Sequence, residues 1–290
     1  MSKTLLIFGC GYSARFVAQN LISKGWTVFG TTRSKENFNK LLKLKIKPVL
    51  WDDITNINNI LIEGCSLLTS IAPKSSRDVG LDRLSQFLAY GKPKINWLGY
   101  MSSTSVYGDR SGGWVDEEST LDANTSQGKA RVEAERKWQK FADEIDAPLF
   151  IFRIAGIYGP GRSIFDKLTA GTAKKVIKTG QYFNRIHVED IGGAISLSML
   201  KTQLAGVFNL SDDLPAEGGD VIDEAAKIMK IPSPPPIGFS EADLTDMAKN
   251  FYSESKRVSN KKLTQILDYS LKHPTYFSGL FDIFSNDGRF

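Results

Sequence analysis

Three small residues stand at a chemically informative spacing near the start of the chain. Gly9, Gly11 and Ala14 form the pattern G-x-G-x-x-A directly after the apolar run Thr4–Phe8. Between a strand and a helix, such glycines permit a sharp turn and let backbone N–H groups approach a pyrophosphate, and a small third residue lets the helix lie against the strand. The pattern predicts a dinucleotide phosphate site; a glycine turn without a ligand is the alternative. The predicted residues of this site are Gly9, Gly11, Tyr12, Ser13 and Ala14.

The residues after the second apolar run, Trp26–Gly30, indicate which dinucleotide the chain prefers. A site selective for NAD has an Asp or Glu here to accept hydrogen bonds from the ribose 2′-hydroxyl, whereas a 2′-phosphate requires cationic and hydroxyl donors. In this chain Thr32, Arg33 and Ser34 follow, and no carboxylate precedes Glu36. The sequence therefore predicts NADP(H) rather than NAD(H), with Arg33 on the 2′-phosphate. A solvated surface arginine is the alternative.

Both motifs belong to an alternation of short apolar runs and helical patterns. Such runs are typical of strands that are buried on both faces of a parallel sheet. The predicted strands are Thr4–Phe8, Trp26–Gly30, Pro48–Trp51, Leu67–Ile71, Asn96–Met101, Leu149–Arg153 and Gly206–Leu210. One predicted helix directly follows the glycine turn. The others cover Lys35–Leu44, Val79–Tyr90, Gln127–Glu144 and a segment that ends at Leu200. The alternation predicts an α/β fold, a doubly wound parallel (Rossmann) sheet with a ligand crevice at the carboxyl ends of its strands.

The ends of these strands supply further candidate site residues. Asp53, Ser70, Ala72 and Ser103 all come at the carboxyl ends of predicted strands, at the edge where the crevice should lie. The fifth strand leads into the polar loop 109–125, which includes Trp114. This loop either forms a lid over the crevice or is a solvated connector with Trp114 packed beneath it.

Composition excludes several classes of protein. A chain of 290 residues can bury roughly three quarters of its unfolded surface, and 41% hydrophobic with 24% charged residues is ordinary for a globular protein. The net charge of +5 is too small to predict a nucleic-acid partner. Cys10 and Cys65 belong to no metal-spaced set and are expected to be free thiols in a reducing compartment. No segment reaches the roughly 18 apolar residues of a membrane span, so we expect a cytoplasmic protein without a membrane partner.

Later motifs resemble one known family. The residues that carry the resemblance are Ser102–Gly108, Arg153, Ile157–Gly161, His187–Asp190, Asn209 and Asn260–Leu263. Their order is that of the extended short-chain dehydrogenases/reductases, the NAD-dependent epimerase/dehydratase family. The resemblance implies bound NAD(P) and reactions that begin with hydride transfer at an alcohol or ketone carbon, often of nucleotide sugars. We expect a Rossmann domain over residues 1–160 and a smaller substrate lobe over 161–290, of which about 186–212 returns to the sheet.

The chain departs from the family pattern at the catalytic pair. The family has Y-x-x-x-K at the start of a helix, and aligning that helix on Val132–Glu135 places Gln127 at the Tyr position and Arg131 at the Lys position. Gln127 cannot titrate and Arg131 stays protonated, so cofactor positioning should survive whereas the usual proton transfer should not. Ser103 aligns with the family's active-site Ser or Thr and can still hydrogen-bond a substrate oxygen.

A substitute acid could come from three other residues. Tyr158 would lie near the nicotinamide in the family geometry, Tyr107 follows the fifth strand, and His187 has an ordinary pKa near the working range. For each of them a structural role is the stronger alternative. The two histidines, His187 and His273, form no metal-spaced set, so no metal site is predicted. The predicted catalytic residues are Ser103, Gln127, Arg131 and Tyr158, and the cofactor set also includes Thr32, Ser34, Asp53, Ser70, Ala72, Arg131 and Ala155.

Two functions remain open from the sequence. The first is an NADP(H)-binding oxidoreductase or epimerase/dehydratase-like enzyme that acts on a carbonyl or alcohol of a sugar-like or nucleotide-linked small molecule. The second is a non-catalytic NADP(H)-binding sensor, which the loss of the Tyr and Lys would permit. A homodimer is compatible with the resemblance, because helices that flank the active site often pair in such folds.

Overall fold

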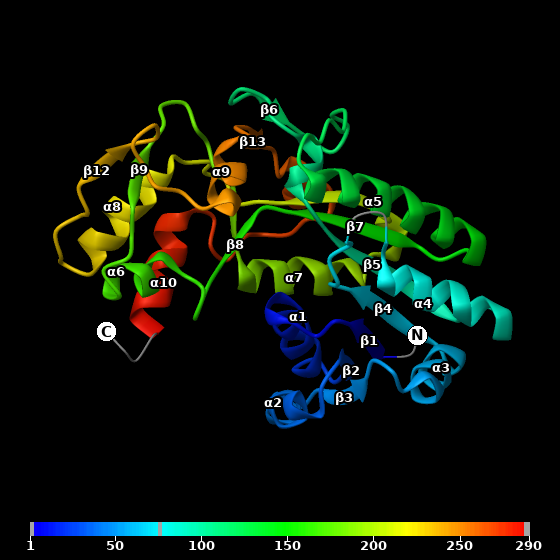
Figure 1. The fold of residues 1–290 in the computed structure, drawn as a ribbon. Helices are drawn as coiled ribbons and strands as arrows, with labels where there is room; N and C mark the ends of the chain where they lie inside the picture. The colour runs from blue at the N-terminus through cyan, green and yellow to red at the C-terminus, as the bar shows by residue number, and fades with distance from the viewer. Residues whose placement is uncertain (1–2, 75–76, 287–290) are drawn as a thin grey trace.

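A parallel sheet of seven strands forms the centre of the computed structural model, which describes residues 3–74 and 77–286 (Figure 1). Its strands are β1 (Thr4–Phe8), β2 (Thr27–Thr32), β3 (Lys47–Leu50), β4 (Cys65–Thr69), β5 (Ile95–Ser103), β7 (Leu149–Ile154) and β11 (Gly206–Leu210). Their order is β11-β7-β5-β4-β1-β2-β3, and every pairing is parallel. The order reverses between β1 and β4, which is where open α/β sheets bind their ligands. The predicted fold class is confirmed.

Helices cover both faces of this sheet (Figure 1). One face carries α1 (Tyr12–Ile22), α2 (Phe38–Lys43) and α7 (Val188–Ser198), and the other carries α3 (Ile54–Glu63), α4 (Val79–Phe87) and α5 (Ser126–Ile145). Because both faces are covered, Leu5 to Phe8 of β1 are all 0% exposed. This burial explains why the strands read as continuous apolar runs rather than as an alternating pattern.

Helix α3 has no counterpart among the predicted elements. Its buried residues Ile57, Ile60 and Leu61 lie at helical spacing, and the Asp53 carboxylate caps its start by accepting a hydrogen bond from Asn56 N at 3.1 Å. Several asparagines lie within the segment, and asparagine is a weak helix former. Tertiary packing on the sheet therefore overrides the local preference.

A smaller unit lies at one end of the sheet, on the left in Figure 1. Its elements are α6 (Ile164–Thr169), α8 (Gly218–Ile228), α9 (Asp246–Tyr252), α10 (Tyr276–Asn286) and the parallel pairs β8 (Gly156–Tyr158) with β10 (Arg185–His187) and β9 (Lys175–Ile177) with β12 (Pro236–Gly238). Phe165, Ile222 and Leu280 belong to its own apolar core. The unit thus lies at the carboxyl ends of the strands with a core of its own, and it joins the core of the sheet through Ile186 of β10.

The remaining elements are short. They are β6 (Trp114–Val115), β13 (Arg257–Val258), the 3-10 turns Lys35–Asn37, Leu88–Tyr90, Thr104–Tyr107 and Thr202–Leu204, and a π-helical turn, Lys262–Ile266. Within the described ranges no helix combines the length and the apolar character that a bilayer span requires. Cys10 and Cys65 are buried free thiols, as predicted.

Candidate cofactor and active site

The glycine turn between β1 and α1 is braced by two neighbouring strands. Gly9 N donates to Thr31 Oγ1 at 2.9 Å, and the Ser70 hydroxyl donates to Gly9 O. Gly9 has a φ of 78°, a conformation that glycine adopts readily, and a Cβ at this position would lie 2.7 Å from Ile71 Cγ1. The strand ends therefore fix the turn, and a larger residue at position 9 would disturb it.

The start of α1 has the properties of an anion site. No described side chain caps its N-terminus, where Gly11 is the capping residue, and its first turn holds no acidic residue. A Cβ on Gly11 would find its nearest atom, Gly9 O, only at 3.9 Å, so the approach to the helix is open. Free N–H groups and the helix dipole favour a phosphate here. The residues present thus fit the pyrophosphate of a dinucleotide.

A cavity of about 780 Å³ extends from this turn over the carboxyl ends of β4, β5 and β7. Its volume is in the range of sites for small molecules and cofactors. The predicted site residues that line it are Gly11, Tyr12, Ser13, Ala14, Ser70, Ser103, Gln127, Arg131 and Ala155. The fold thus brings most of the two predicted sets, cofactor-binding and catalytic, into one space.

Other predicted cofactor residues lie outside the cavity. At the end of β2 the Thr32 hydroxyl accepts hydrogen bonds from Ser34 N at 3.4 Å and from Asn37 Nδ2 at 3.2 Å, and Arg33 is exposed. Arg33 forms no ion pair with any residue in the described ranges. Asp53 is occupied as the cap of α3, and Ala72 is exposed beyond β4.

Helix α5 presents its two substituted positions to the cavity. Gln127 and Arg131 are four residues apart and so share one face of the helix. Arg131 Nη1 donates to Met101 O at 2.8 Å, which ties the helix to the end of β5, whereas Gln127 is exposed. Ser103 Oγ accepts a hydrogen bond from Ser105 N at 3.2 Å, and its own O–H can donate to a ligand.

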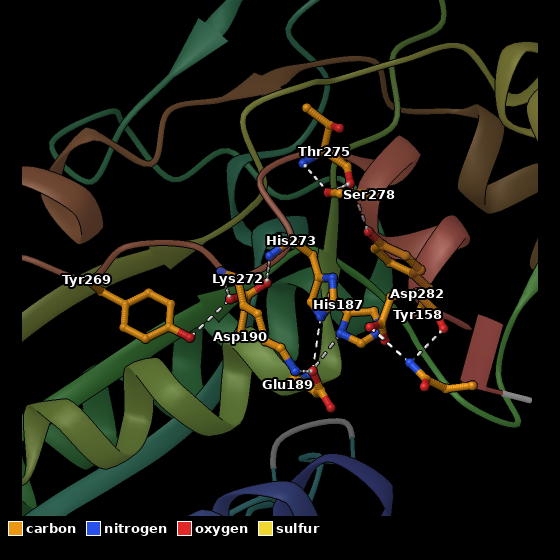
Figure 2. Close-up of polar contacts among 11 residues, drawn as sticks. Tyr158, His187, Glu189, Asp190, Tyr269, Lys272, His273, Thr275, Ser278 and Asp282 are labelled. Carbon is orange, nitrogen blue, oxygen red and sulfur yellow. Dashed lines mark hydrogen bonds and ion pairs between the residues drawn. The ribbon is translucent and has the colours of Figure 1, made fainter. Parts of the chain in front are cut away.

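Tyr158 does not join this group. Its side chain does not line the cavity. The hydroxyl lies 3.5 Å from Thr275 O, and the ring is edge-on to His187 at 5.2 Å between centroids (Figure 2). Burial, reinforced by the Asp212 and Asp190 carboxylates, raises the pKa of Tyr158 far above its ordinary value. The structure therefore does not support a catalytic role for Tyr158.

The two histidines lie together, which the sequence spacing did not indicate. The ring centroids of His187 and His273 are 3.9 Å apart, and Figure 2 shows both beside Glu189. With Glu189 they form a set of three potential metal ligands within 4.8 Å of one another, so the prediction that the histidines form no constellation is wrong. Glu189 Oε2, however, already contacts His273 Nε2 at 3.0 Å and Lys272 Nζ at 2.5 Å.

Protein contacts account for most of this cluster, whereas His187 Nε2 is buried without a hydrogen-bond partner among the described residues. His187 Nδ1 accepts a hydrogen bond from Glu189 N at 3.4 Å as the cap of α7, and Asp190 accepts hydrogen bonds from Tyr269 and from the backbone of residues 272 and 273. Burial and the neighbouring His273 lower the pKa of His187 to about 3, so its ring stays neutral. We therefore interpret the cluster as a set of contacts that holds α7 against the segment before α10. His187 is not a candidate for the general acid.

A buried ionic network lies beneath the cavity. Arg153 of β7 and Glu135 of α5, whose side chains are both 6% exposed, pair at 2.9 Å. Ser102 donates to Glu135 at 2.5 Å, Arg153 donates to the Tyr107 hydroxyl at 3.0 Å, and Tyr107 donates to Asn209 at 2.7 Å. Burial raises the pKa of Tyr107 to about 12, so this tyrosine is also a structural residue rather than an acid. The network fixes β5, β7, β11 and α5 relative to one another.

The far wall of the cavity comes from residues that the sequence did not single out. Tyr182, Asn184, Phe251, Glu254 and Lys256 line it together with the motif residues. They follow β9 or precede β13, far along the chain from the glycine turn, and no local pattern links the two regions. Their role depends on tertiary structure alone.

The loop 109–125 supports this wall. Of its residues only Thr125 lines the cavity. Arg110 N and Gly112 N both donate to Ser255 O, at 2.9 and 3.0 Å, and β6 pairs with β13. Trp114 is 61% exposed, so it is not packed beneath the loop either. The loop thus does not cover the cavity in this structure, and the packing predicted for Trp114 is wrong; the loop braces the segment around residues 255–258.

The chain is similar to several known proteins. No family model matches the chain. A conserved protein of unknown function from Silicibacter pomeroyi DSS has a solved structure that is 40% identical in sequence, with a TM-score of 0.89 over 98% of this chain and 99% of that one. Protein YeeZ of Escherichia coli K12 is 26% identical over 223 residues, which are 72% of this chain and 77% of YeeZ.

More distant solved structures share the fold. The dTDP-glucose 4,6-dehydratase of Bacillus anthracis, in complex with NAD, has a TM-score of 0.78 at 16% identity over 99% of this chain and 97% of that one. The human epimerase family protein SDR39U1, with NADPH, has a TM-score of 0.75 at 15% identity over 98% and 99%. The chain therefore belongs to one family with the Silicibacter pomeroyi protein, and its fold is that of the extended short-chain dehydrogenases/reductases that its motifs resemble.

Proposed function

We propose that the protein is an NADP(H)-dependent oxidoreductase or epimerase/dehydratase-like enzyme in which Gln127 and Arg131 replace the usual Tyr and Lys. The observation that carries this proposal is the single cavity, which joins an open helix N-terminus to Ser103 and to the substituted face of α5. A phosphate site and polar side chains that converge on one space are what a cofactor-dependent site requires. The two buried free thiols agree with a cytoplasmic location.

The preference for NADP(H) rests on the end of β2. Arg33 is exposed and has no carboxylate partner among the described residues, so it is available to a 2′-phosphate. The Thr32 and Ser34 hydroxyls beside it can add hydrogen bonds. The structural neighbour SDR39U1 is described with NADPH, which supports a nicotinamide cofactor in this fold.

The bound nicotinamide would supply or accept a hydride, and the chain's own residues would hold the substrate. Ser103 can hydrogen-bond the reacting oxygen, and Gln127 can donate to it without titrating. Arg131 can hold ribose hydroxyls or a phosphate. The aromatic Tyr182 and Phe251 with Arg162 offer surfaces for a sugar-like or nucleotide-linked molecule, and the dehydratase neighbour is named for a nucleotide sugar.

A non-catalytic sensor of NADP(H) is the second candidate. The exposed, non-titrating Gln127 favours it, because proton transfer by Tyr usually contributes about 10²–10⁴ in rate. Purified protein with NADPH and a panel of nucleotide sugars and small ketones separates the two candidates. Substrate-dependent oxidation of NADPH supports the enzyme, whereas tight NADPH binding without any turnover across the panel supports the sensor.

The cofactor preference has its own test. Arg33→Asp should weaken NADP(H) binding at least tenfold more than NAD(H) binding in calorimetric titrations, because it replaces a cation at the 2′-phosphate by an anion. Lys35→Asp makes the same charge change two residues further on and should affect both cofactors little. Equal losses of both cofactors in Arg33→Asp would contradict the assignment.

A further inference from the structure

The proposed site has no side chain on α5 that can transfer a proton to or from the substrate. We propose that Lys256 and Glu254, on the far wall of the cavity, form its proton-transfer pair. This inference rests on the proposed function, because it assigns the group that gives or takes the proton of the substrate's oxygen. It replaces the family's Tyr and Lys by residues from a different part of the chain.

The lining of the cavity leaves few alternatives. Besides arginines, the described lining residues with titratable side chains are Tyr12, Tyr182, Glu254 and Lys256. Tyr12 belongs to the phosphate end, its hydroxyl donates to Pro160 O at 2.9 Å, and burial raises its pKa to about 12. The Arg257 Cζ atom lies 3.7 Å from the centroid of the Tyr182 ring. Tyr182 is therefore the competing candidate for the acid.

The geometry of the pair is unusual for a surface ion pair. Lys256 Nζ lies 2.6 Å from Glu254 Oε2, and the two side chains are only 7% and 9% exposed. Glu254 Oε1 is buried and accepts no hydrogen bond from any residue in the described ranges. Burying an ion pair is costly, and a carboxylate oxygen without a donor adds to that cost. A buried acceptor without a donor is unusual in a native protein and marks this pair as more than a structural contact.

The backbone around the pair is held at the strand ends. Asn184 O accepts from Gly156 N at 3.0 Å, Asn184 Nδ2 donates to Lys256 O at 2.9 Å, and Asn184 Oδ1 accepts from Val258 N at 2.7 Å. Gly156 directly follows Ala155, just beyond the end of β7, so one residue, Asn184, connects the Lys256 backbone to the predicted cofactor residues. Gln181 Nε2 fixes the Glu254 carbonyl at 2.7 Å. Such support gives the positional precision that catalytic groups need.

The electrostatic setting suits a general acid and base. Burial lowers the pKa of Lys256, and the Glu254 carboxylate opposes that shift. The other charged groups near the ammonium are Asp109, which favours the charged form, and Arg110, which disfavours it. A lysine whose pKa is lowered releases its proton more readily than an ordinary lysine, whereas an amide such as Gln127 cannot titrate.

For a ketone substrate, the step transfers one proton and one hydride. The Lys256 ammonium gives its proton to the carbonyl oxygen while the carbonyl carbon receives the hydride of NADPH. The C=O π bond breaks, a C–H and an O–H bond form, the ketone is reduced and NADPH is oxidised to NADP⁺. The neutral Lys256 amine then regains a proton from solvent, with Glu254 as the acceptor and donor along the path. Alcohol oxidation follows the same steps in reverse.

The first experiment measures the amine itself and needs no substrate. Protein labelled with ¹³C at lysine Cε is titrated by NMR, and the Lys256 signal is assigned by its disappearance in Lys256→Arg. We expect Lys256 to titrate at lower pH than Lys227, an exposed lysine of α8, and Glu254→Gln to lower the Lys256 pKa further because the stabilising carboxylate is lost. An ordinary lysine titration for Lys256 overturns the proposal, whatever the activity assays show.

The second experiment tests catalysis with NADPH and the carbonyl substrates identified in the panel. Lys256→Arg keeps a cation beside Glu254 and should preserve the fold and NADPH affinity, but it should lower kcat by about 10²–10⁴ because arginine cannot release a proton. The control Lys227→Met should retain activity within a factor of a few, and Tyr182→Phe, which keeps the ring and removes only the hydroxyl, tests the competing acid. Full kcat in Lys256→Arg, or its loss in Tyr182→Phe alone, refutes the pair. Absence of NADPH binding by the unmodified protein would instead refute the proposed function.

Discussion

The ion pair between Arg153 and Glu135 should be among the most sensitive positions for stability. Arg153 makes three contacts to Glu135, one to the Tyr107 hydroxyl and one to Glu117 O. The variant Arg153→Met leaves the Glu135 carboxylate, 6% exposed, without its cation. Breaking one side of a buried pair costs about 3–5 kcal/mol, since the remaining charge is neither solvated nor paired. For a chain of 290 residues such a loss lowers Tm by roughly 5–8 °C.

Urea unfolding and thermal melts of matched variants test this value. The control is Arg136→Met on α5, the helix of Glu135, because Arg136 pairs with Glu133 at 2.9 Å but has a side chain that is 77% exposed. We expect no measurable change there. The double variant Arg153→Met/Glu135→Leu should recover part of the loss, since no charge is left buried alone. If Arg153→Met costs less than about 1 kcal/mol, or if the double variant is as unstable as the sum of the single ones, the reasoning is refuted.

Three further predictions concern the turn, a buried acid and the thiols. Gly9→Ala should abolish NADPH binding in calorimetry and lower stability, because a Cβ would lie 2.7 Å from Ile71 at a φ of 78°; unchanged binding would contradict the role of the turn. Burial raises the pKa of Asp212 from 3.8 to about 8, so its contribution is fully present below pH 3.8 and is lost as pH rises to about 8; Asp212→Asn should flatten this decline of Tm between pH 5 and 9, and a parallel curve would disprove it. Burial raises the pKa of Cys10 to about 11 and of Cys65 to about 12, so neither should react with a water-soluble disulfide reagent until urea unfolds the protein.

The sheet could be predicted from the sequence because strands that are buried on both faces consist almost entirely of apolar residues. A run such as Thr4–Phe8 is apolar without interruption, and both of its faces are covered in the structure. Helix α3 was missed because its asparagines are weak helix formers. Its apolar residues form a recognisable helix face only where they pack on the sheet. Local patterns therefore sufficed wherever local preference and tertiary packing agree.

The candidate site divides in the same way. The glycine turn, Ser103, Gln127 and Arg131 were found from spacing and resemblance, and they line one cavity. Tyr158 was placed there by family geometry, but its hydroxyl is directed to Thr275 instead. Glu254 and Lys256 carried no signal, because a charged pair two residues apart reads as a surface loop until its burial is known.

The position of β11 in the sheet has a consequence for synthesis on the ribosome. β11 pairs with β7, yet it is made only after more than fifty further residues have been added to the nascent chain. Until then β7, with Phe150 and Phe152, is an open edge that any extended peptide could join. A stalled or proteolysed polypeptide that ends before residue 206 would therefore be a substrate for chaperones rather than a miniature of the complete protein.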